Sequence, residues 1–103
     1  MKKGYNKVIF VGYIGSRPEL RRTPQGVAVG TFSLCVPKRR EKEEDVVIDI
    51  VAFRTLAEES CSALTTGQTV LVEGTLAPYR WNKAASGQPC GYEVRAATIS
   101  ILE

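Results

Sequence analysis

The sequence predicts an all-β fold that contains one short helix. Five segments are rich in the β-branched and aromatic residues that favour strands. A single segment combines helix-capping residues with apolar residues at helical spacing. With 103 residues, of which 44% are hydrophobic, the chain is expected to form one domain over residues 1–103.

The predicted strands are separated or bent by glycine and proline. Their ranges are 7–14, 27–36, 46–54, 68–81 and 91–102. Gly12 marks a bulge or a point of close approach in the first strand, and Gly74 marks a kink in the fourth. In the last strand the apolar parity changes between Val94 and Ile99, which predicts a bulge near residues 96–97.

One helix is predicted over residues 55–67, between the third and fourth strands. Thr55 and Glu58 have the spacing of a capping box, and Gly67 suits the position just past a helix end. A lone helix at this point among five strands is typical of the OB-fold, a five-stranded Greek-key barrel. Such barrels bind oligonucleotides or oligosaccharides on one face and its loops.

Composition argues against several classes of protein. The chain has no histidine, which excludes sites that need an imidazole base, and it lacks the glycine motifs that cradle phosphate. Cys35, Cys61 and Cys90 lack the close pairing of a zinc site, so we expect small, partly buried residues there. We therefore predict a binding protein that is no enzyme and holds no metal or other cofactor.

The apolar runs predict an intracellular protein with no membrane partner. The longest run, residues 8–11, is too short to cross a bilayer, and polar residues 4–7 occupy the place of a signal peptide's apolar segment. The expected location is the cytoplasm, at the nucleoid, or an organelle if the chain is encoded in a plastid.

Charge is segregated along the chain, although the net charge is only +3. Basic residues gather at 17–22, 38–40 and 80–83, and acids gather at 41–45 and 58–59. Segregation of this kind can form a basic face that attracts phosphate, and the alternative is an ordinary mixed surface.

Five segments carry a family resemblance. They are NKVIFVGYIGSRPELRRTPQGVAVGTFSL from residue 6, AFRTLAE at the helix start, LVEGTL, RW and GYEV. Through these segments, the chain resembles the bacterial single-stranded DNA-binding (SSB) proteins from about residue 6 to residue 102. The resemblance implies an OB-fold that forms homo-oligomers, as tetramers or alternatively dimers. It also implies binding of single-stranded DNA with little sequence preference, in replication, recombination or repair.

The resemblance also implies where DNA would bind. Bases would stack on aromatic rings, while lysines and arginines would contact phosphates. Two of the family's four prominent stacking positions remain aromatic here, as Phe53 and Trp81. The other two fall on Arg40 and Val47. The candidate site residues are Lys7, Tyr13, Arg17, Arg21, Arg22, Lys38, Arg39, Arg40, Phe53, Arg54, Tyr79, Arg80 and Trp81.

Several of these roles have alternatives. Tyr13 and Tyr79 are placed to compensate for the lost stacking positions, with packing on the surface or at an interface as the alternative for Tyr13. Phe53 either stacks on a base or packs in the core. The arginines within residues 17–22 either contact phosphate or form a solvated loop. Asp49, in the third strand, either weakens binding or pairs with a nearby arginine.

The chain also departs from the family in its loop and its end. Residues 37–45 form a hairpin loop in which acids directly follow the basic residues. The chain stops after the fifth strand, without the acid-tipped tail through which family members recruit replication proteins. If the sequence is the full protein, it cannot recruit partners in that way, and if it is a piece of a longer one the question stays open. The loss of two stacking positions and the acid-rich loop favour an alternative function, that of an OB-fold interaction protein, similar to the primosomal relative of SSB, that binds nucleic acid weakly.

Overall fold

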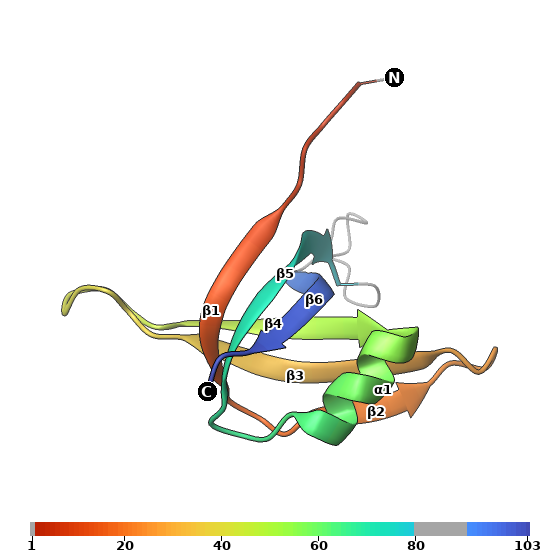
Figure 1. The fold of residues 1–103 in the computed structure, drawn as a ribbon. Coiled ribbons are helices and arrows are strands. Elements are labelled where there is room, and N and C mark those ends of the chain that lie inside the picture. Colours follow the sequence, from red (N-terminus) through yellow and green to blue (C-terminus); the bar gives the residue numbers. More distant parts are fainter. Residues whose placement is uncertain (1, 80–90) are drawn as a thin grey trace.

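The computed structural model describes residues 2–79 and 91–103. Five of its strands close into a barrel, a sixth lies outside it, and one helix packs against them, which confirms the expected OB-fold (Figure 1). The elements are β1 (Val8–Ile14), β2 (Glu19–Arg22), β3 (Ala28–Val36), β4 (Val46–Phe53), α1 (Arg54–Ala63), β5 (Thr69–Pro78) and β6 (Tyr92–Ile101).

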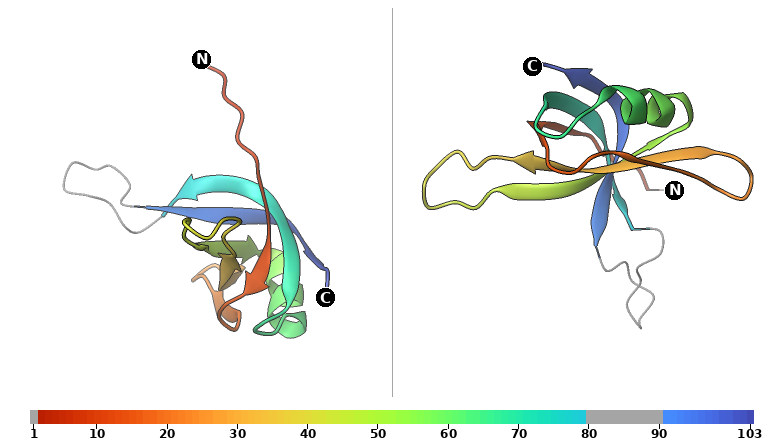
Figure 2. Two further views of the ribbon diagram at one scale, coloured as in Figure 1. Left: turned by 90° about the vertical axis from the view of Figure 1, so that its left-hand side faces the viewer. Right: turned by 90° about the horizontal axis from the view of Figure 1, so that it is seen from below.

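The barrel closes because β1 pairs with two different strands. The strand order is β1-β5-β6-β4-β3-β2, and the last residues of β1 also pair with β3, where Tyr13 lies opposite Cys35. The β4–β6 pairing is parallel, whereas the other pairings are antiparallel. The bend of β1 is seen in Figure 1 and that of β5 in Figure 2, and closure of a small barrel requires such curvature.

The barrel interior is filled by aliphatic side chains from every barrel strand. Residues with no exposed surface include Ile14, Leu34, Ile50, Val72 and Val94. Each residue of this kind stabilises the fold by roughly 1.5–3 kcal/mol when it leaves water. The alternate residues of these strands point away from the interior, and those that are exposed, such as Val47, are available for binding.

The predicted glycine positions and bulge are confirmed. A Cβ atom added at Gly12 would clash with the carbonyl oxygen of Cys35, and one at Gly74 would clash with the carbonyl oxygen of Arg95. The register between β5 and β6 shifts at this point, because Glu73 pairs with Thr98 and Gly74 pairs with the residue at 96. The residue at 97 is thus the extra residue of a bulge.

The segment between the first two predicted strands is not a simple loop, and the sequence-based prediction missed strand β2. Glu19–Arg22 pairs antiparallel with residues 28–31 of β3 through a tight turn. In that turn, the N–H of Gly26 donates to the carbonyl of Thr23 (2.8 Å), and Gly26 has a φ of 86°. Pro24 and Gly26 occupy positions that such turns favour, so the turn was readable from the sequence.

The predicted capping of the helix is wrong. Helix α1 begins at Arg54 and ends at Ala63, so Gly67 lies well beyond its end. The N-cap position is Phe53, and no side-chain hydrogen bond caps the helix there. Arg54 has a φ of 58°, which bends the chain sharply from β4 into the helix. Among residues 2–79 and 91–103, no helix is long and apolar enough to cross a membrane.

Candidate nucleic-acid interface

The outer face of β3 and β4 carries two of the four family stacking positions. Ile48 and Ile50 point toward the core, so alternation along β4 places Val47, Asp49 and Phe53 on the other face. Val47 is 66% exposed, whereas Phe53 is half-buried at the point where β4 meets the helix. The face therefore offers one aliphatic and one aromatic surface in line along the same strand.

Tyr13 extends this face across the barrel. It is paired with Cys35, which is itself paired with Val47, so the three residues form a row over β1, β3 and β4. Tyr13 is 40% exposed, and a hydrogen bond with the buried Cys35 thiol raises the pKa of Tyr13. This hydrogen bond holds Tyr13 at Cys35, in the same row as Val47. Base stacking and packing remain the two alternative roles for its ring.

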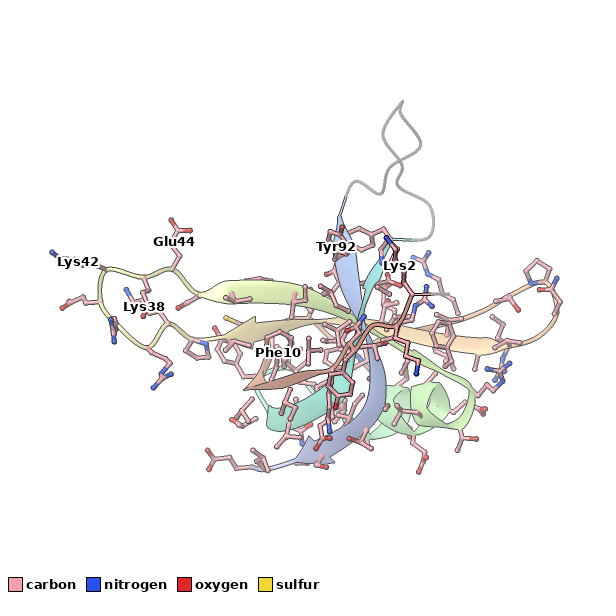
Figure 3. The ribbon with its side chains drawn as sticks, turned by 90° about the horizontal axis from the view of Figure 1, so that it is seen from above. Lys2, Phe10, Lys38, Lys42, Glu44 and Tyr92 are labelled. Atoms are coloured by element: carbon pink, nitrogen blue, oxygen red, sulfur yellow. The ribbon has the colours of Figure 1, made fainter. Side chains whose placement is uncertain are left out.

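The loop between β3 and β4 projects away from the barrel, and Figure 3 labels Lys38, Lys42 and Glu44 along it. The backbone N–H of Lys38 donates to Asp45 Oδ1 (2.8 Å), and its Nζ donates to the carbonyl oxygen of Glu41 (3.3 Å). These hydrogen bonds order the loop, but neither pairs the Lys38 ammonium with a carboxylate. The candidates at positions 39 and 40 are exposed.

Three of the predicted phosphate contacts are paired with acids of the chain. The ion pairs are Lys7–Glu73 (3.7 Å), Arg21–Glu19 (3.4 Å) and Arg22–Glu58 (3.8 Å). All six side chains are more than one-third exposed, and exposed pairs of this kind contribute little to stability. These cations can exchange a carboxylate for a phosphate at small cost.

Arg17 differs from the paired arginines. It is exposed and has no acidic partner within 4.0 Å among the described residues. Arg54 is likewise exposed, at the start of the helix. Arg17 lies on the connection from β1 to β2, so its charge stands at the border of the β3–β4 face.

Asp49 accepts a hydrogen bond from a tyrosine, and among the described residues it forms no ion pair with an arginine. The hydroxyl of Tyr79 donates to Asp49 Oδ2. This hydrogen bond, with smaller contributions from burial and from the charges of Asp49 and Glu93, raises the pKa of Tyr79 to about 12. Tyr79 is thereby fixed just beyond the end of β5, and the negative charge of Asp49 remains on the face.

A cavity of about 370 Å³ opens beside Asp49. Its lining includes three carboxylates, Glu19, Asp49 and Glu93, and one cation, Arg17. The sequence-based prediction missed two of these acids. Glu93 alternates with the buried Val94 along β6, yet it is itself only 8% exposed. No local pattern could have brought together residues from β2, β4 and β6, because only the barrel closure does so.

The remaining candidates fall outside this geometry. Arg80, Trp81 and Cys90 lie outside the described residues, so their roles stay predictions. Cys35 is buried and Cys61 is half-buried, as expected of small packing residues. Burial raises the pKa of the Cys61 thiol, which reduces its reactivity.

Comparison with known proteins finds one matching family model and several similar proteins. The model of the single-strand binding protein family matches residues 5–102. A single-stranded DNA-binding protein of Helicobacter hepaticus is 31% identical, over 96% of this chain and 62% of the relative. Single-stranded DNA-binding protein 2 of Staphylococcus aureus is 34% identical, over 95% of this chain and 73% of the relative.

A third relative is of similar distance. Single-stranded DNA-binding protein A of Bacillus subtilis is 34% identical, over 95% of this chain and 59% of the relative. The chain thus spans between 59% and 73% of the length of these three relatives.

Proposed function

Because the chain belongs to the single-strand binding protein family, we propose that it binds single-stranded DNA across the outer face of β3 and β4. Bases would lie on Tyr13, Val47 and Phe53, and phosphates would follow the exposed cations at the border of the face. Stacking on aromatic rings tolerates any base, so sequence preference along most of the path is small. The role is one of binding and not of catalysis.

One observation carries this proposal, namely that the stacking candidates share a face. Val47 and Phe53 project from the same side of β4, and the row through Cys35 sets Tyr13 beside them. Each aromatic platform contributes roughly 1–3 kcal/mol per stacked base. Arg17, at the edge of this face, has a charge that no acid of the described chain neutralises within 4.0 Å.

The salt dependence of binding tests this path. Each phosphate contact steepens the plot of log affinity against log salt by roughly 0.7 for single strands. We expect Arg17→Gln to reduce the magnitude of that slope by roughly 0.7, the value for the loss of one phosphate contact. Arg22→Gln, a matched variant whose arginine is paired with Glu58, should lower it less. Fluorescence anisotropy of a labelled oligo-dT at several salt concentrations measures both slopes.

Equal slopes for wild type and Arg17→Gln would remove Arg17 from the path. A slope near zero for the wild type would contradict the proposed function itself, because phosphate contact requires counterion release.

A specific observation also favours the alternative, an interaction protein with a weak hold on DNA. Three carboxylates line a cavity on the proposed face, and three candidate cations are already paired with the chain's own acids. A stable oligomer that fails to bind oligo-dT would support this alternative. The proposed work in replication, recombination or repair, and in the cytoplasm, rests on family membership.

We further propose that the chain forms a homo-oligomer through β1. From Val8 to Gly12 this strand pairs with β5 on one side, and the described residues pair with it on the other side only beyond Gly12. On its outer face Ile9 is 56% exposed and Val11 is 47% exposed. An open, apolar edge strand readily pairs with another chain, and a second copy is the natural occupant.

A further inference from the structure

A row of paired residues leads from the outward face of β4 across the barrel toward the start of the chain. Val51 lies on the outward side of β4, two residues before Phe53, and it pairs with Arg95 of β6. Arg95 in turn pairs with Thr75 of β5. Residues that pair directly point to the same side of a sheet, so this row continues the proposed DNA face over two further strands.

The row ends on Lys7, the residue just before β1. Val8 pairs with Gly74, so Lys7 comes opposite Thr75, and both residues line the same groove. The side chains of Lys7 and Arg95 are 49% and 42% exposed. Adjacent strands lie roughly 4.8 Å apart, so the row from β4 to Lys7 spans about 14 Å and carries two cations.

A groove of about 280 Å³ adjoins the end of this row. It is lined by residues 5–7, by residues 73–75 of β5 and by Ala97, the extra residue of the β6 bulge. Ala97 is exposed and contributes only a methyl group to the lining. The volume is below that of cavities that hold drug-sized ligands, which suits one base or sugar of a strand that passes over the groove.

Tyr5 lines this groove and is nevertheless 91% exposed. The residue that follows it is fixed to β5 by two hydrogen bonds. Asn6 Nδ2 donates to the carbonyl oxygen of Leu76 (2.6 Å), and the N–H of Leu76 donates to Asn6 Oδ1 (3.0 Å). The backbone at Tyr5 is therefore anchored beside β5, which reduces the entropy that is lost when a ligand contacts the ring.

The charges around the groove favour a polyanion. Lys2 and Lys3 precede Tyr5 on a segment that runs away from the barrel (Figure 1), and both are exposed. Neither lies within 4.0 Å of an acid of the described chain. The ion pairs of Lys7 and Arg95, at 3.7 Å and 3.9 Å, balance one acid each, so these two lysines are in excess.

We propose that single-stranded DNA continues from the β3–β4 face along this row, and that one of its bases stacks on Tyr5. The proposal rests on the proposed binding of single-stranded DNA. Arg95 and Lys7 would contact phosphates along the row, and the two lysines that precede Tyr5 would contact those beyond it. An aromatic ring that adjoins a line of cations is the arrangement with which proteins hold single strands.

Position and lining favour DNA over a second copy of the chain as the occupant. The edge of β1 proposed for self-association runs from Val8 to Gly12, and Tyr5 precedes it. Among the described residues, Ala97 is the one aliphatic side chain that lines the groove, whereas an interface between copies needs larger apolar side chains. The paired row also connects the groove directly to the β4 face.

Anisotropy of a labelled oligo-dT of about 35 nucleotides tests the stacking role of Tyr5. We expect Tyr5→Ala to weaken binding about tenfold, the effect of losing one stacked base. Tyr5→Phe keeps the ring and should bind within about twofold of the wild type. The salt dependence of Tyr5→Ala should equal that of the wild type, because tyrosine carries no charge that a phosphate could neutralise.

The matched control is Tyr92→Ala. Tyr92 is also exposed, at 53%, but it pairs with Pro78 and points to the opposite side of β6 from Arg95. It should leave the affinity unchanged. Neither tyrosine belongs to the barrel core, so both alanine variants are expected to fold.

The outcomes separate this proposal from the function on which it rests. A wild type that fails to bind oligo-dT would contradict the proposed function. Unchanged affinity of Tyr5→Ala, an equal loss in Tyr92→Ala, or a loss in Tyr5→Phe as large as that in Tyr5→Ala would overturn stacking on Tyr5 alone. A smaller mass of Tyr5→Ala in sedimentation equilibrium would place Tyr5 between copies, and would likewise overturn it.

Discussion

At the scale of single residues, the pair of Tyr79 and Asp49 fixes the chemistry of the barrel surface. The tyrosine hydroxyl donates to the carboxylate and keeps its proton to a higher pH than a free tyrosine, with a pKa of about 12 against 10.0. The hydrogen bond positions the Asp49 carboxylate on the face. It also holds Tyr79, the residue that directly precedes residues 80–90.

The pair gives the stability of the protein a defined dependence on pH. Below pH 10 the hydroxyl is protonated in both the folded and the unfolded chain, so the stabilisation is fully present. Between pH 10 and about 12 the folded chain keeps a proton that the unfolded chain releases, so the stabilisation is lost as pH rises. Tyr79→Phe should lack this loss, and should cost about 1 kcal/mol or less near neutral pH.

Difference spectra of tyrosinate between wild type and Tyr79→Phe, recorded during an alkaline titration, check this value. A difference signal that titrates near pH 10 would show that the hydrogen bond does not form in solution.

At the scale of elements, Gly12 within β1 and Gly15 just after it differ in the space that a side chain would have. Gly12 lies where β1 crosses β3, so closely that the carbonyl of Cys35 occupies the space of a side chain. Gly15 follows the strand, and a Cβ there would find Ser33 O at 3.6 Å, an ordinary contact. The first glycine is therefore required by barrel closure, and the second is not.

Alanine at these two positions should separate the effects. We expect Gly12→Ala to lower the free energy of unfolding by about 1–3 kcal/mol, because the strands must move apart. Gly15→Ala should change it by about 0.5 kcal/mol or less. Urea denaturation followed by circular dichroism measures both values, and equal losses would contradict the assigned close approach.

The strands of the barrel were predictable because each one alternates or carries a continuous apolar run. The bulge at residues 96–97 was also readable, since parity changes within one strand. Strand β2 was missed because its residues are all exposed, so no apolar pattern marks it. The capping box failed because the chain enters α1 through the positive φ of Arg54, directly from β4.

The candidate site was predictable only in part, for a physical reason. Alternation along β4 places Val47 and Phe53 on one face, and the sequence alone shows it. The approach of Glu93 to Asp49 depends on the parallel pairing of β4 with β6, which joins residues far apart in the chain. Contacts of this kind follow from the closed barrel and leave no mark in a local segment.

At the scale of the whole molecule, the exposed edge of β1 predicts self-association. Val11→Lys would place a charge on the apolar face that a second copy must cover, so the protein should sediment as a smaller species. Val46→Lys is the matched control, because Val46 is 49% exposed against 47% for Val11 and lies on β4. Sedimentation equilibrium reports both masses, and an unchanged mass for Val11→Lys would place the interface elsewhere.

The central claim is that this barrel binds single-stranded DNA, and the chain's single tryptophan, Trp81, tests it most directly. We would titrate an oligo-dT of about 35 nucleotides into the protein and follow tryptophan emission at low and at high salt. The account predicts deep quenching that weakens as salt rises. Unchanged emission together with an unshifted band in a gel would contradict it.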